Sequence, residues 1–225
     1  PGRVYGAIEG QATKDPAYGL DAVWIDTRDR EKAQSLGYTV VDAATVVATH
    51  VSRVLKEHAH ELLGHEEAQQ LIDVLARTHP KLVESLVPET LELRIVLKVL
   101  QQLLAEQVPV RDMRSILEAL SHAATRTRDP DELTAAVRLA LGRSIVQQIA
   151  GNAEELPLIA LDARLEQLLH RSVQQDGPAT IEPDLAARLV QSIREVVEQQ
   201  ERDGIPSVLV VAPEIRAWVS GWLRA

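Results

Sequence analysis

The chain has 225 residues, with 24 Lys and Arg against 33 Asp and Glu, so its formal charge at pH 7 is -9. This acidic balance argues against binding to nucleic acid or to an anionic membrane surface, because both require clustered cations. The absence of cysteine excludes disulfides, thiolate nucleophiles and cysteine-ligated zinc. A hydrophobic fraction of 45% with only 3% aromatic residues predicts a globular protein with an aliphatic core. No apolar run reaches the roughly 18 residues of a membrane span.

The glycine-rich beginning of the chain predicts a small α/β unit. We expect a strand over residues 20–25, a charged helix from residue 26 or 27 to residue 36, and a second short strand over residues 38–42. Gly37 directly follows the expected helix, at the position where a glycine commonly ends one.

Helical periodicity dominates from Ala43 onward. Residues 43–63 predict one long helix that ends at Gly64. Apolar residues at positions 96, 99, 100, 103 and 104 form a single stripe, which is typical of a helix packed on one face. Asp129, followed by Pro130 and Glu132, predicts the capped start of a helix that runs to about residue 149. The other helices expected in this region cover residues 66–77, 80–88 and 111–125.

The last third of the chain returns to an α/β pattern. Residues 156–161 predict a strand, and Pro157 favours a sheet edge because proline cannot donate to a ladder. A second strand is expected over residues 207–211, and a loop over residues 175–178. The remaining segments predict helices that begin after Asp162, at Pro183 and at Pro213. The expected class is therefore α+β and helix-rich, with a small α/β piece, a central all-helical part and a C-terminal α/β part.

The sequence contains no signature of phosphate, dinucleotide or serine-nucleophile chemistry. It has neither a Gly-x-x-x-x-Gly-Lys loop nor a Gly-x-Ser-x-Gly elbow. His58, Glu61 and His65 have a spacing that would place them on one face of an unbroken helix, which allows a metal-dependent hydrolase as an alternative function. Gly64 argues against this alternative, since a helix that ends there scatters the three side chains.

Two aromatic features have a structural and a functional interpretation. Residues 15–19 predict a tight turn, with Asp15 opening it, Pro16 fixing φ and Gly19 closing it. Tyr18 is then either a recognition residue on a stiff loop or a cover for the adjacent strand. Trp218 and Trp222 lie four positions apart on the last helix, either packed in a core or forming a partner surface.

Several long strings resemble the FlhA/InvA-type family of type III export gates. They are far more specific than any short motif, and they are dense between residues 10 and 143. The strings are residues 15–20 (DPAYGL), 37–50 (GYTVVDAATVVATH), 58–64 (HAHELLG), 98–101 (KVLQ), 108–114 (VPVRDMR), 116–120 (ILEAL) and 137–143 (VRLALGR). The segment VVATH at residues 46–50 is more similar to the flagellar branch than to the export gates of virulence injectisomes.

The resemblance implies a non-enzymatic gate protein anchored in the bacterial inner membrane, with no cofactor. Its cytoplasmic part forms a ring, a nonamer by resemblance, and contains four subdomains. Residues 1–62 would hold the end of the first two, which are interleaved, residues 63–142 the helical third, and residues 143–225 the α/β fourth without its closing strands. We therefore expect a soluble fragment of a longer chain, itself not inserted in the membrane.

The resemblance also implies a site for flagellar export chaperones with bound cargo. In the family, these complexes dock in a shallow apolar depression between the first two subdomains. Carried over by position, the site contains Asp15, Tyr18 and Thr49, with Val41 and Val47 as neighbouring apolar residues. The family more often has Phe at the position of Tyr18, and the added hydroxyl makes the rim of the depression more polar. Other components of the export apparatus are further expected partners.

Overall fold

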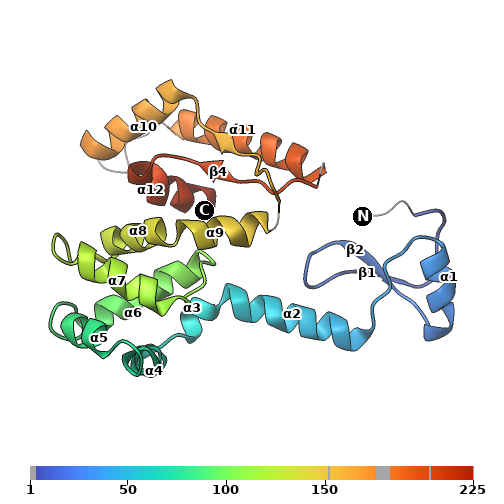
Figure 1. Cartoon of the computed structure of the whole chain (residues 1–225). Coiled ribbons are helices and arrows are strands. Elements are labelled where there is room, and N and C mark those ends of the chain that lie inside the picture. The colour runs from blue at the N-terminus through green and yellow to red at the C-terminus, as the bar shows by residue number, and fades with distance from the viewer. Residues whose placement is uncertain (1–3, 152, 176–182, 203, 225) are drawn as a thin grey trace.

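The computed structural model describes residues 4–151, 153–175, 183–202 and 204–224. It begins with an antiparallel hairpin of β1 (Gln11–Lys14) and β2 (Asp21–Trp24), in which Gln11 lies opposite Trp24 and Lys14 opposite Asp21. The short helices η1 (Thr27–Asp29) and α1 (Arg30–Ser35) follow. In Figure 1 this N-terminal unit lies apart from the other helices and is joined to them by α2.

The prediction of a second strand over residues 38–42 is wrong. This segment has no regular structure and makes no strand pairing among the described residues. It is held from its start instead, because the backbone N–H of Tyr38 donates to the Ala33 carbonyl and its hydroxyl donates to the Gly6 carbonyl, at 3.1 and 2.9 Å. The strand beside β2 is β1, whose sequence QATK lacks the apolar alternation that marks a strand.

The predicted long helix over residues 43–63 is divided at His58. Helix α2 (Ala43–Glu57) ends there, and the short helix α3 (Ala59–Leu62) continues in a new direction. The side chain of Asp42 caps α2 by accepting a hydrogen bond from the Thr45 backbone N–H at 2.8 Å. Among the described residues, nothing buries any residue of α2.

Six further helices pack into an all-helical bundle, as the helical periodicity of this region predicted. They are α4 (His65–Ala76), α5 (Pro80–Leu86), α6 (Leu93–Ala105), α7 (Met113–Ala123), α8 (Pro130–Ala140) and α9 (Gly142–Ala150). The stripe on α6 is confirmed, since Val96, Val99, Leu100 and Leu103 are fully buried. One helix was expected from Pro130 to about residue 149, but the structure divides it at Leu141, whose side chain is buried in the same core.

The C-terminal part contains a two-stranded parallel sheet of β3 (Ile159–Ala160) and β4 (Leu209–Val210), which are shorter than predicted. Its helices are α10 (Ala163–Gln175), α11 (Pro183–Arg202) and α12 (Pro213–Arg224). They enclose a second cluster of apolar residues, separate from that of the bundle. Most of the loop predicted over residues 175–178 lies outside the described residues.

The tryptophan pair on α12 packs against this second cluster, with ring centroids 4.3 Å apart. Its structural interpretation is therefore confirmed. The α+β, helix-rich class is also confirmed, whereas the subdomain boundaries after residues 62 and 142 stay a prediction. Within the described part of the chain, none of the helices combines the length and the apolar character that a membrane crossing requires.

Candidate functional site

The turn between β1 and β2 is shaped by its own hydrogen bonds. The Asp15 carbonyl accepts from the Gly19 N–H at 2.7 Å, and the Asp15 N–H donates to the Leu20 carbonyl at 2.8 Å. One carboxylate oxygen of Asp15 also accepts from the Ala17 N–H at 2.6 Å. Gly19 has a φ of +68°, a left-handed conformation that glycine adopts without strain. Asp15 therefore organises the backbone of the turn.

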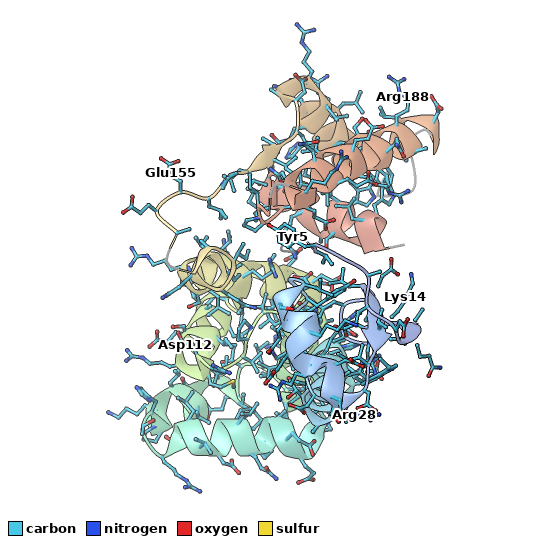
Figure 2. The ribbon with its side chains drawn as sticks, turned by 90° about the vertical axis from the view of Figure 1, so that its right-hand side faces the viewer. Tyr5, Lys14, Arg28, Asp112, Glu155 and Arg188 are labelled. Atoms are coloured by element: carbon cyan, nitrogen blue, oxygen red, sulfur yellow. The ribbon has the colours of Figure 1, made fainter. Side chains whose placement is uncertain are left out.

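Tyr18 is presented to solvent by this turn. Its exposed fraction is 68%, whereas the neighbouring Ala17 is only 1% exposed. Tyr18 thus does not fold back to cover the adjacent strand, and the recognition interpretation of this residue fits the geometry. Leu20, which follows the turn, is 63% exposed and extends the apolar surface. In Figure 2, Lys14 at the end of β1 projects away from the ribbon.

Helix α2 supports the turn through Arg53. One guanidinium nitrogen of Arg53, Nη1, donates to the Ala17 carbonyl oxygen. The Nε–H of the same side chain donates to Oε1 of Glu57 at 2.7 Å, one helical turn further along. Thr49 precedes Arg53 by one turn, so it lies on the same helix face, and it is half-buried. Arg53 therefore joins α2 to the turn that carries Asp15 and Tyr18, and Thr49 lies one helical turn from this contact. That the three residues form a common site stays a prediction.

Val41 and Val47 are both exposed, at 53% and 62%, but they occupy different positions. Val41 directly precedes the capping residue of α2. Val47 stands two residues before Thr49, and a helical rotation of about 100° per residue places the two on nearly opposite faces. Val47 lies on an apolar stripe along α2, which lines an open depression of about 890 Å³ and includes Ala44, Val47, Ala48, Val51 and Leu55. Its role in chaperone docking, like that of Val41, stays a prediction.

This stripe was missed by sequence reasoning, although its spacing was available. The apolar residues recur at positions i, i+3, i+4, i+7 and i+11, a pattern that normally marks a buried helix face. Val51 and Leu55 are 48% and 52% exposed, so the described residues leave the face uncovered.

The histidines beyond α2 do not assemble a metal centre. His58 Nδ1 and Glu61 Oε1 form a pair at 2.8 Å, and this hydrogen bond and the charge of Glu61 raise the pKa of His58. Gly64 caps the start of α4, so His65 begins a different helix. Throughout the described ranges, no group of three or more His, Asp or Glu side chains is placed to hold a metal ion. The geometry gives no support to the metal-dependent hydrolase.

The turn exposes an aromatic residue, and α2 exposes an apolar stripe on the face directed away from the turn. Exposed apolar groups of this kind are typical of surfaces that bind other proteins. Comparison with known proteins identifies the family, since the FHIPEP family matches residues 1–225. The chain belongs to the FHIPEP family.

A curated relative is the flagellar biosynthesis protein FlhA of Proteus mirabilis, 49% identical over 224 residues, which cover 100% of this chain and 32% of that protein. The chain thus spans about a third of the length of the curated relatives it matches. The structure of Chlamydia pneumoniae CdsV matches with a TM-score of 0.79 and 24% identity, over 92% of this chain and 60% of that one. The structure of nonameric EPEC SctV-C matches with a TM-score of 0.74 and 22% identity, over 99% of this chain and 68% of that one. At these identities the structures establish a common fold.

Proposed function

We propose that the chain is part of the cytoplasmic docking platform of a flagellar type III export gate. It receives export chaperones with bound cargo and passes the subunits to the export channel. The observation that carries this proposal is Tyr18, which is 68% exposed on a turn whose backbone is fixed by Asp15. An exposed aromatic residue that is already ordered loses little conformational entropy on binding, which favours recognition of a protein surface.

The flagellar branch is favoured over an injectisome gate by the degree of similarity. The curated FlhA relative is 49% identical to this chain, whereas CdsV is 24% identical. The proposal places the parent protein in the bacterial inner membrane and this part at its cytoplasmic face. It also includes assembly into a homo-oligomeric ring, for which nonameric SctV-C is the precedent, and contact with other export components.

The platform is proposed to be non-enzymatic and to act without a cofactor. The FHIPEP family consists of transport components, and flagellar FlhA is one of its members. The energy for export would then come from elsewhere in the machine. We keep the division at residues 62 and 142 as part of the proposal, with the docking site in the first of the three segments.

The test is the affinity of full-length protein for an export chaperone with its cargo, measured with Tyr18→Ala. Loss of an aromatic anchor is expected to weaken binding by about 1–3 kcal/mol, while the unfolding midpoint stays unchanged because the side chain is exposed. Tyr5→Ala is the matched control, since Tyr5 is 76% exposed in the same N-terminal unit but lies outside the turn. Equal affinities of Tyr18→Ala, Tyr5→Ala and the wild type would contradict docking at this turn.

A further inference from the structure

The hydrogen bonds within the turn fix its shape but not its orientation relative to α2. Orientation usually comes from apolar packing, and here little of it is present. Among the described residues from 4 to 62, only the side chains of Ala17 and Ala33 are buried. Both are small, so their burial contributes little to holding the hairpin in place. A polar interaction is therefore needed to define how the turn is oriented relative to α2.

Arg53 makes that interaction, across 36 positions of sequence. Its Nη1 donates to the carbonyl oxygen of Ala17. This carbonyl belongs to the same planar peptide group as the backbone nitrogen of Tyr18. A hydrogen bond that fixes the orientation of this peptide plane therefore also fixes the backbone orientation at Tyr18.

Glu57 orients the arginine for this role. It accepts from the Nε–H of Arg53 at 2.7 Å, while Nη1 of the same guanidinium donates to the turn. The two side chains are 45% and 37% exposed, and an exposed ion pair of this kind has little effect on stability by itself. The hydrogen bond to the Ala17 carbonyl connects this ion pair on α2 to the turn.

We propose that Arg53 is a positioning residue of the docking site, which holds the turn against α2 so that Tyr18 and Thr49 face one partner. This inference rests on the proposed function. This positioning role requires the planar guanidinium of arginine, because one group must donate to Glu57 and to the Ala17 carbonyl in two fixed directions. Lysine keeps the charge but offers a single ammonium group on a flexible stem.

The experiment measures orientation and binding separately in the full-length protein. Spin labels at Lys14→Cys and Lys56→Cys report the distance between the hairpin and α2 by double electron–electron resonance. These 225 residues contain no cysteine, so only cysteines elsewhere in the protein need replacement. Arg53→Lys is expected to broaden the distance distribution and to weaken chaperone–cargo binding by roughly tenfold, which corresponds to one lost charge-assisted hydrogen bond.

Arg114→Lys is the matched control. Arg114 also donates through Nε to a glutamate four residues later, Glu118, at 2.9 Å, but it does so in the helical bundle. The control should change neither the distances nor the affinity. Glu57→Gln, which keeps the arginine but weakens its orientation, should broaden the distribution less than Arg53→Lys.

An unchanged distance distribution in Arg53→Lys would overturn the inference, and so would a broadened distribution with unchanged affinity. Failure of the proposed function gives a different result, because Tyr18→Ala would then bind like the wild type. The distance measurement does not depend on that outcome, so the two failures can be told apart.

Discussion

The connection between the two apolar clusters gives the strongest prediction about stability. Glu106, at the end of α6, accepts through one oxygen from Arg138 on α8 and from Arg216 on α12, each at 2.5 Å. Arg138 belongs to the helical bundle, whereas Arg216 belongs to the C-terminal part (Figure 1). A single carboxylate therefore links two parts whose cores are separate. We predict that Glu106→Gln loosens this connection.

The magnitude follows from the exposure of the three side chains, which is 14% for Glu106, 18% for Arg138 and 29% for Arg216. Breaking a fully buried pair costs about 3–5 kcal/mol, and breaking an exposed pair costs about 0–1 kcal/mol. The site lies between these limits, so Glu106→Gln should lower the free energy of unfolding by about 2 kcal/mol in total. We expect about half of this to appear as coupling between Glu106 and Arg216.

A double-mutant cycle of Glu106→Gln and Arg216→Gln measures that coupling by urea denaturation. Fluorescence follows the C-terminal cluster through Trp218 and Trp222, with Trp24→Phe as the background, and circular dichroism follows all helices. In Glu106→Gln the fluorescence transition should move to lower urea than the circular dichroism transition. Coincident transitions together with a coupling energy below about 0.3 kcal/mol would show that the carboxylate does not link the two parts.

Three further predictions concern the docking site, a helix cap in the bundle and the His58–Glu61 pair. Thr49→Met should fill the space beside the turn and lower chaperone–cargo affinity in calorimetry without unfolding α2, because methionine is a good helix former; unchanged affinity would count against Thr49 as a site residue. Asp112→Ala should lower the free energy of unfolding by about 1 kcal/mol, because it removes the cap of α7. Hydrogen bonds from the Ser115 side chain and backbone lower the pKa of Asp112. Its contribution to stability is therefore present at neutral pH and is lost as the pH falls through that lowered pKa. The NMR titration of His58 should show a pKa above about 6.5, and Glu61→Gln should lower this pKa. Because the pKa of His58 is raised in the folded protein, the His58–Glu61 pair stabilises the fold fully below the usual pKa, and this stabilisation is lost as the pH rises through the raised pKa.

The helical core could be predicted from sequence because each helix buries one face, and burial imposes a period on the chain. The stripe on α6 was recognisable for this reason, and Val96 and Leu100 are indeed fully buried. The cap at Asp129 was also predictable, because capping depends on neighbouring residues alone. In the structure, the Asp129 carboxylate accepts from the backbone N–H groups of Asp131 and Glu132.

The break at His58 could not be predicted because its cause is distant in sequence. The chain leaves α2 at His58, packs α3 against α6, and is held there by Gln101, whose side-chain amide donates to the Leu63 carbonyl at 2.9 Å. These partners are 38 positions apart. Local propensity favours a continuous helix through this segment, and tertiary packing overrides it.

The candidate site divides along the same line. Turn chemistry is local, so Asp15, Pro16 and Gly19 were sufficient to predict a stiff turn with Tyr18 upon it. The contribution of Arg53 is a long-range contact and left no pattern in the sequence. The assignment of Val47 rested on resemblance and stays a prediction. The helix expected over residues 43–63 already places Val47 nearly opposite Thr49, because the rotation is about 100° per residue.

Helix α2 connects these observations, because it presents two faces with different tasks. One face carries Thr49 and Arg53 toward the turn, and the other carries the apolar stripe that includes Val47 and Leu55. An isolated helix of about 15 residues is marginal in water, and α2 gains no buried residue from the described chain. Any contact that covers the stripe must therefore stabilise the same helix that supports the turn. If docking at Tyr18 requires an intact α2, we therefore expect by linkage that covering the stripe favours docking, and that docking favours the covered stripe to the same extent.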